Sequence, residues 1–355
     1  TVLENFLRCD KKPFWNNAFH KALFQPRKFQ GIHVHMPKHP LRPDARQCNA
    51  MGEEIDAAAL YTAAHERHRG MDRAKLTWEG ACLNHYTIKS EDLFLLKNDR
   101  GDGANQGGTK RYLNSTFHRR YNTNRRSDSS ILRHMPEVSE RMTEMRADPL
   151  LATLEQVAQI WWDNRRDRAD ARAYRRMDPA GRGRRHPRKG RLMESRHGSK
   201  VVLSCMRNEG MFLLEWIAYY RVIGFEKAVV VTNNCTDGTD LMLDRLEQMG
   251  YVRHLRNDWR GAGRPQMESL RIAREEVDDL VLAEWCLHVD SDEFLNVTCG
   301  DGHVDDLLDL MPPTEAVAIA WRLFGNNGHK TWPGGLVTEN FTRARAEPAW
   351  NSCLH

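Results

Sequence analysis

Three apolar runs in the last third of the chain, each followed by a short polar motif, constrain the fold more than any other feature. The runs cover residues 200–206, 228–232 and 285–289. The polar motifs that follow them cover residues 207–209, 233–239 and 290–293. Short continuous apolar runs are typical of strands buried on both faces of a parallel sheet. The sequence therefore predicts parallel strands with polar residues gathered at their carboxyl ends.

Helical periodicity fills the segments between these runs. Apolar residues recur at helical spacing over 212–223, over 239–249 and over 266–277, and glycines follow the first two segments. Strands that alternate with helices predict an α/β fold with a right-handed, doubly wound sheet. Ligands bind such sheets at the carboxyl ends of the strands, which is where the polar motifs lie.

The third motif carries the most specific chemistry. Residues 290–293 read Asp-Ser-Asp-Glu. Two carboxylates that are two residues apart present hard oxygen ligands at one strand end, and a divalent metal held there can clamp a diphosphate. We expect Asp292 to bind the metal and Asp290 to share it or to hold a ribose. The alternative for both is a solvated turn at the end of a strand.

The two ends of the chain repeat each other. Residues 2–20 align with residues 337–355 without a gap, and nine of the nineteen positions are identical. Such a repeat indicates that the chain begins late in one copy of a domain and stops at the same place in a second copy. The alternative is that two complementary parts of the chain pack together as one permuted domain.

An arginine-rich segment separates the two parts. The chain has a net charge of +5, and residues 164–198 are strongly basic. We predict that residues 151–197 form a linker that is partly helical and partly disordered. Its arginines also suit weak contact with a polyanion or an anionic membrane through counterion release.

Five short motifs in a fixed order carry a resemblance to a known family. They lie at residues 206–209, 215–225, 237–239, 290–295 and 321–325. Together they resemble the family-2-like glycosyltransferases of GT-A fold, and more narrowly the subgroup related to the family 92 glycosyltransferase domain. The resemblance covers nearly all of residues 198–355, and residues 84–90 with Arg100 and Gly101 are similar to a later segment of the same family.

The resemblance implies a fold and a domain organisation. The expected fold is a GT-A-type, Rossmann-like, mixed and mainly parallel sheet with flanking helices. Residues 1–150 then correspond to the back, acceptor-side half of one glycosyltransferase domain. Residues 198–355 correspond to the front, nucleotide-sugar-binding half of a second one.

The resemblance also implies a reaction. Such an enzyme moves a sugar from a nucleoside-diphosphate sugar to a hydroxyl acceptor on a glycan, with inversion at the anomeric carbon. Bound Mn²⁺ or Mg²⁺ offsets the charge on the leaving diphosphate. A UDP-type donor is expected. The alternatives are a non-catalytic nucleotide- or sugar-binding module of a tandem protein, and a polyanion-binding protein that acts through the arginine-rich segment.

The candidate site residues follow from the motifs and the resemblance. The residues expected to bind the nucleotide sugar are Arg207, Asn208, Glu209, Asn233, Asp237 and Asp290. The expected metal ligands are Asp290, Asp292 and His85, and the candidates for the general base are Glu293, Asp10 and Glu347. An ordinary turn and helix cap is an open alternative for Asp237, and a core or surface histidine is one for His85.

Cysteine usage and hydropathy indicate in which compartment of the cell the protein is expected. The eight cysteines include no Cys-x-x-Cys pair, which favours a reducing, cytoplasmic compartment. No apolar run reaches the roughly eighteen residues that a spanning helix needs. Peripheral contact with the inner face of a membrane through residues 164–198 is a further option, and no specific nucleic-acid partner is expected.

Overall fold

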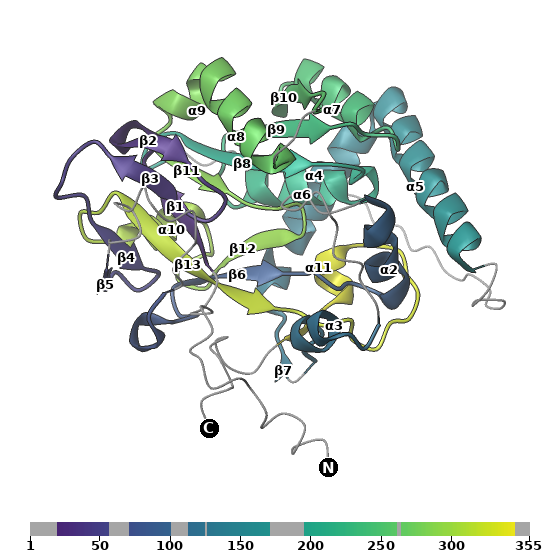
Figure 1. The fold of residues 1–355 in the computed structure, drawn as a ribbon, viewed down its shortest axis with the longest axis horizontal. Helices are drawn as coiled ribbons and strands as arrows, with labels where there is room; N and C mark the ends of the chain where they lie inside the picture. The colour runs from purple at the N-terminus through teal and green to yellow at the C-terminus, as the bar shows by residue number, and fades with distance from the viewer. Residues whose placement is uncertain are drawn as a thin grey trace, which may run out of the picture.

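A ten-stranded sheet forms the centre of the molecule, with helices against both of its faces (Figure 1). The computed structural model describes residues 20–56, 71–100, 113–124, 126–170, 195–260 and 264–344. The strands of this sheet are β1 (His20–Phe24), β4 (Gln47–Asn49), β5 (Glu54–Ile55), β6 (Ala81–His85), β8 (Lys200–Met206), β9 (Lys227–Asn233), β10 (Val252–Asn257), β11 (Trp285–His288), β12 (Glu293–Val297) and β13 (Ala316–Leu323). Two short pairs lie outside it: β2 (Phe29–Ile32) with β3 (Pro37–Pro40), and β7 (Arg126–Ser127) with β14 (Arg343–Ala344).

Helices lie against both faces of the sheet. Successive side chains of a strand point to opposite faces, so an apolar strand presents side chains to both layers of helices. The helices are α2 (Glu91–Arg100), α3 (Thr116–Tyr121), α4 (Met135–Arg146), α5 (Pro149–Asp170), α6 (Gly210–Val222), α7 (Thr239–Gln248), α8 (Pro265–Glu276), α9 (Asp278–Leu282), α10 (Val304–Asp309) and α11 (Val337–Asn340). Val202 and Val230 belong to the core that includes α4, α5, α6 and α7. Their neighbours Val201 and Val229 belong to a second core with α8 and α9. The sheet is therefore buried on both faces, as the continuous apolar runs predicted.

The predicted α/β class is confirmed, and so are the parallel strands of the last third. β8 pairs in parallel with β9 and with β11, and β9 pairs in parallel with β10. The three predicted helices correspond to α6, α7 and α8, with bounds that differ by at most two residues. The whole sheet is mixed, because β1 runs antiparallel to both of its neighbours.

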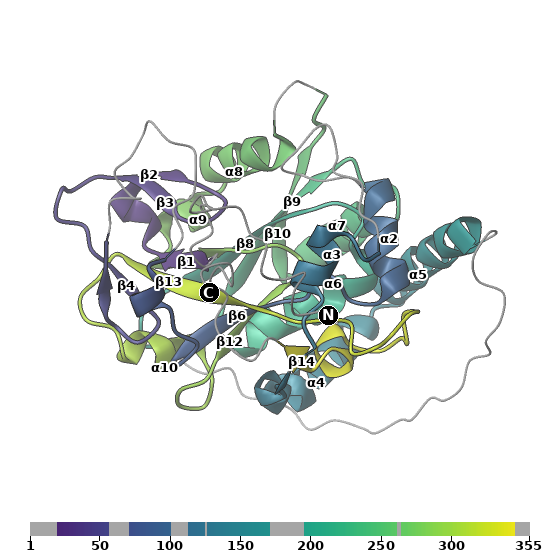
Figure 2. The ribbon, with the colours of Figure 1, turned by 60° about the horizontal axis from the view of Figure 1, so that its bottom comes forward.

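Strands from the two parts of the chain alternate in this one sheet. β1 lies between β11 and β13, and Figure 2 shows β1 beside β13. Leu23 of β1 faces Leu287 on one side and Val317 on the other. β6 lies between β12 and β13. The two parts thus pack as complementary pieces, which is the arrangement expected from the second interpretation of the repeated ends. Their tandem origin stays a prediction, because residues 1–19 and 345–355 lie outside the described residues.

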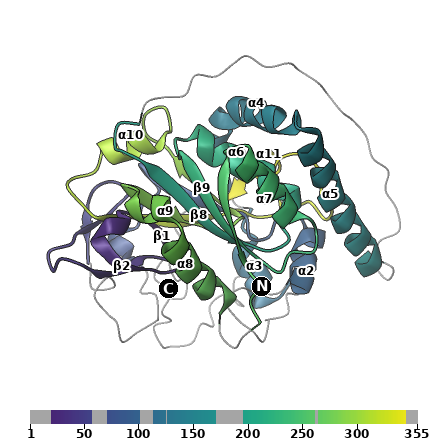
Figure 3. The same ribbon diagram turned by 90° about the horizontal axis from the view of Figure 1, so that it is seen from above.

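The beginning of the predicted linker is a helix. α5 runs to Asp170 and packs against α6 and α7, at the right of the molecule in Figure 3. Its Ala158 and Trp162 side chains are buried, and Trp162 packs against Phe212 of α6. Residues 171–194, which hold most of the arginines of the segment, lie outside the described residues. Among the residues that are described, no helix combines the length and the apolar character needed to cross a membrane.

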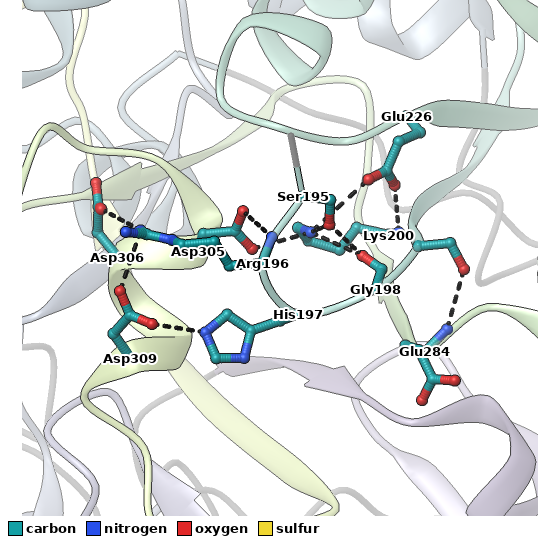
Figure 4. A network of polar contacts seen from close by, with 11 residues as sticks. Ser195, Arg196, His197, Gly198, Lys200, Glu226, Glu284, Asp305, Asp306 and Asp309 are labelled. Carbon is teal, nitrogen blue, oxygen red and sulfur yellow. Dashed lines mark hydrogen bonds and ion pairs between the residues drawn. The ribbon is translucent and has the colours of Figure 1, made fainter. Parts of the chain in front are cut away.

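An ion-pair network anchors the chain where it enters β8 (Figure 4). The buried Lys200 ammonium lies 2.9 Å from Asp305 of α10 and donates to the carbonyl of Gly198 at 2.8 Å. Arg196 lies 2.8 Å from Asp306 and 3.0 Å from Asp309. These contacts join the start of a central strand to α10, so they fix the path of the chain after the linker.

Candidate functional site

The predicted polar motifs follow the carboxyl ends of three neighbouring strands. β8 ends at Met206, β9 at Asn233 and β11 at His288. β8 is parallel to both β9 and β11, so all three strands end at the same edge of the sheet. The structure therefore brings the motifs to one edge, which is where open α/β sheets bind ligands.

The first two motifs are joined by hydrogen bonds. Asn208, with a left-handed φ of 55°, accepts a bond from the Thr236 N–H at 2.7 Å. One Asp237 carboxylate oxygen accepts from the Gly210 N–H at 3.0 Å, at the start of α6. The other accepts from the N–H and the hydroxyl of Thr239, at 2.9 and 2.6 Å, at the start of α7. Asp237 is 1% exposed and makes the turn and cap contacts that the sequence left open as an alternative, and nucleotide contact by Asp237 or Asn208 stays a prediction.

The remaining candidates of these motifs differ in exposure. Arg207 is exposed and Asn233 is half-buried at the end of β9. Glu209 is buried, and its N–H donates to the Thr239 hydroxyl at 2.9 Å. Arg207 and Asn233 therefore have the side chains that reach the surface of this edge, and nucleotide contact by any of the three stays a prediction.

Asp290 is partly exposed and contacts β1 on one side and α8 on the other. Its side chain is 37% exposed, and its Oδ2 is 3.7 Å from the ammonium of Lys21, which is fully buried in β1. Its Oδ1 accepts a hydrogen bond of 3.0 Å from the side chain of Gln266 in α8. Burial raises the pKa of Asp290, but Lys21 and His288 outweigh it, so the pKa lies below its ordinary value. An ionised carboxylate therefore faces solvent at this edge.

Glu293 is buried directly behind Asp290. One of its oxygens accepts the Asp290 N–H at 2.8 Å and lies 3.4 Å from the Lys21 ammonium. Burial raises the pKa of Glu293 well above its ordinary value, and Lys21 opposes that effect. For Lys21, burial lowers the pKa, but the two carboxylates outweigh it and raise the pKa, so the ammonium keeps its proton. Glu293 thus holds the turn that carries Asp290.

The general base stays a prediction. Glu293 is fully buried, with 0% of its side chain exposed. The other candidates, Asp10 and Glu347, lie outside the described residues.

Asp292 is paired with groups from the first part of the chain. Its Oδ2 accepts a hydrogen bond of 2.7 Å from Lys97 of α2, and its Oδ1 lies 3.6 Å from Nε2 of His85 at the end of β6. The His85 ring packs against Trp321, with ring centroids 4.4 Å apart. Burial raises the pKa of Asp292, but Lys97 and His85 outweigh it and hold the pKa well below its ordinary value. The structure therefore brings His85 to the aspartate pair.

These side chains do not converge on a metal position. In the part of the chain that the structure describes, no group of three or more His, Cys, Asp or Glu side chains could hold a metal ion. Instead, Lys97 is bonded to one oxygen of Asp292, and Lys21 lies beside Asp290. A divalent ion on Asp292 Oδ2 would have to displace the Lys97 ammonium, and Oδ1 has only His85 beside it, so the donor set as arranged does not fit Mn²⁺ or Mg²⁺. The metal cofactor stays a prediction.

Sequence reasoning missed the two lysines. Lys21 stands in β1 next to Ala22, Leu23 and Phe24, and all of them are buried. Lys97 follows Leu96 on the face of α2 that is buried. A lysine inside an apolar strand, or on the apolar face of a helix, is a signal for a buried ion pair, because such an ammonium needs a partner. The partners, however, are separated from the lysines by about two hundred residues or more, so the sequence does not name them.

Comparison with known proteins supports a glycosyl-transfer relationship. The chain is similar to family 92 glycosyltransferases. A family 92 glycosyltransferase of Oryza sativa subsp. japonica is 29% identical over 175 residues, which cover 46% of this chain and 27% of that protein. One of Ricinus communis is 27% identical over 146 residues, which cover 40% of this chain and 25% of that protein.

The extent of this similarity is limited. The matched segment spans about a quarter of the length of these curated relatives. No family model matches the chain, and no solved structure matches it significantly. The coarse prediction of a glycosyltransferase relationship is thus supported. Membership of the GT-A group, the inverting course and the donor stay predictions.

Proposed function

We propose that this chain is a glycosyltransferase, or the donor-binding part of one, that takes a sugar from a nucleoside-diphosphate sugar. The observation that carries this proposal is the pair Asp290 and Asp292, which follows β11 at the carboxyl edge of a parallel sheet. The similarity to family 92 glycosyltransferases supports the same assignment.

In this proposal the nucleotide lies across the ends of β8, β9 and β11. The ionised Asp290 is exposed enough to accept hydrogen bonds from a ribose, and Gln266 and Lys21 hold it in place. The exposed Arg207 can pair with phosphate oxygens through its planar fork of donors. A UDP-type donor and a glycan hydroxyl acceptor are the proposed substrates.

The proposed reaction is a single displacement with inversion. The acceptor oxygen forms a bond to C1 of the sugar while the bond from C1 to the diphosphate oxygen breaks. The electron pair of that bond stays on the diphosphate, and the acceptor proton passes to a base. The charge that develops on the diphosphate is offset by cationic side chains of the site.

Release of nucleoside diphosphate tests the proposal without knowledge of the acceptor. The full chain would be incubated with UDP- and GDP-sugars in the presence of Mn²⁺, and free UDP or GDP would be measured. We expect slow hydrolysis of one donor, and a loss of about tenfold or more in the Asp290→Ala variant. Asp279→Ala is the matched control, because Asp279 is exposed on α9 and pairs with Lys227.

The outcomes separate the proposal from its rival. Nucleotide binding without release of diphosphate from any donor, even with added glycan acceptors, would favour the non-catalytic binding module. Equal release by the Asp290→Ala variant would contradict the assignment of the site.

A further inference from the structure

An ion pair joins Lys97 of α2 to Asp292, the second aspartate of the motif. Lys97 donates to Asp292 Oδ2 at 2.7 Å and to the carbonyl oxygen of Thr87 at 2.6 Å. The Lys97 and Asp292 side chains are 8% and 10% exposed. A fixed carbonyl and a fixed carboxylate thus hold the ammonium in one position beside the second aspartate of the motif.

The surrounding chain holds Asp292 in the same way. Its carbonyl accepts the Tyr86 N–H at 2.8 Å. Its second carboxylate oxygen faces His85, which also makes a hydrogen bond with the Thr87 hydroxyl. The last residue of β6 and the two residues after it therefore contact the carboxylate, the main chain and the ammonium, so Lys97 and Asp292 are positioned as a unit.

This ammonium occupies the place that a metal bound to Oδ2 of Asp292 would need. A divalent ion binds a carboxylate oxygen at roughly 2.0–2.6 Å. The Lys97 nitrogen is already 2.7 Å from Asp292 Oδ2. Like charges this close repel strongly where water is largely excluded. Lys97 and a divalent ion are therefore alternatives at Asp292 Oδ2.

The other aspartate has a lysine of its own. Lys21 lies 3.7 Å from Asp290 and 3.4 Å from Glu293. Each aspartate of the motif is thus matched with a buried ammonium from the first part of the chain. Protein side chains thus place a positive charge beside each aspartate of the motif.

We propose that Lys97 supplies the positive charge that a divalent metal supplies in other diphosphate-binding sites, so that the donor binds and reacts here without a metal. This inference rests on the proposed function. When the bond between C1 of the sugar and the diphosphate oxygen breaks, the electron pair stays on that oxygen. Lys97 offsets the added charge and keeps its own proton.

Calorimetric titration of the full chain with UDP and with GDP, in EDTA and then in Mn²⁺, tests this inference. We expect one nucleotide to bind with affinities that agree within about threefold under the two conditions. In EDTA, Lys97→Met is expected to weaken binding by about tenfold or more. Lys227→Met is the control, because Lys227 pairs with Asp279 at the amino end of β9, away from the site.

The opposite result has a distinct signature. If the nucleotide binds only with Mn²⁺, and Lys97→Met binds it with Mn²⁺ as tightly as the unmodified chain or more tightly, then Lys97 competes with the metal. That result overturns this inference and leaves the proposed function standing. If neither nucleotide binds the folded, unmodified chain under either condition, both are overturned.

Folding of the variants is checked by circular dichroism. Lys97→Met leaves a buried carboxylate without its main partner, which is destabilising. The double variant Lys97→Met/Asp292→Asn removes both charges, and we expect it to fold and to lack binding in EDTA. Binding by this double variant in EDTA equal to that of the unmodified chain would overturn the inference. The comparison of EDTA with Mn²⁺ on the unmodified chain decides the question whether or not a variant folds.

Discussion

Buried lysines determine the charge at the edge of the sheet where β11 ends. Lys21 and Lys97 come from β1 and α2, and their partners Asp290, Asp292 and Glu293 come from the end of β11 and the start of β12. A buried ion pair gains little over an apolar pair of the same shape, but the loss of one partner is costly. Each residue of this cluster is therefore tied to the others by the cost of leaving a charge unpaired.

Replacement of Lys21 by methionine tests this dependence. Lys21 is fully buried, so Lys21→Met leaves Asp290 and Glu293 without their buried cation, and we expect the free energy of unfolding to fall by about 3 kcal/mol or more. The double variant Lys21→Met/Glu293→Gln also replaces the buried carboxyl group by a neutral amide and should recover part of that loss. Urea unfolding measures both changes. A single variant within about 0.5 kcal/mol of the unmodified chain would show that the pair carries no such cost.

At the scale of elements, the 3-10 helix η4 (Ser130–His134) joins the first part of the chain to the second. His134 is buried, and its Nε2 lies 3.1 Å from the carbonyl oxygen of Gly302, to which the neutral ring donates. Its ring also packs against Tyr219 of α6 and against His303. Burial lowers the pKa of His134 to about 4. A fall in pH is therefore expected to weaken the contact between His134 and Gly302.

The sign of the pH effect follows from linkage. The folded state releases the His134 proton at a pKa of about 4, whereas the unfolded chain does so near 6.5. The contribution of neutral His134 to the free energy of unfolding is fully present above pH 6.5. It falls as the pH drops toward 4, because over this range only the unfolded state binds a proton at this ring. The slope is at most about 1.4 kcal/mol per pH unit.

Urea unfolding at pH 7 and at pH 5 measures this contribution. Between pH 7 and pH 5, we expect the free energy of unfolding of the unmodified chain to fall by up to about 2 kcal/mol more than that of His134→Gln. The reason is that glutamine can donate to the Gly302 carbonyl without titrating. His39→Asn is the control, because His39 is exposed and asparagine tolerates its positive φ. The same loss in His134→Gln as in the unmodified chain would assign the pH dependence to other groups.

The predictability of the elements depended on where their partners lie in the sequence. α6, α7 and α8 follow from local periodicity, and β8, β9 and β11 from local apolar runs, so their positions were predicted. β1 and β6 are stabilised by pairing with strands more than two hundred residues away, and no local pattern names those partners. The same limit applies to the site: the aspartates could be predicted from their motif, but their lysines could not.

At the scale of the whole molecule, the two parts of the chain complete one another. β1 fills the position between β11 and β13, and β6 fills the one between β12 and β13. The first part thereby delivers Lys21, His85 and Lys97 to an edge of the sheet built from the second part. The candidate site exists only when both parts are folded together, and for this reason binding should be measured on the full chain.

Titration calorimetry of UDP against the full chain and its Asp290→Ala variant tests the central claim most directly. We expect UDP to bind the unmodified chain, both in Mn²⁺ and in EDTA. Under each condition the variant is expected to bind UDP at least about tenfold more weakly. The Asp279→Ala control should bind as the unmodified chain does. UDP binding of equal strength in the Asp290→Ala variant, or no binding to the folded unmodified chain, would contradict the placement of a nucleotide-sugar site at this edge of the sheet.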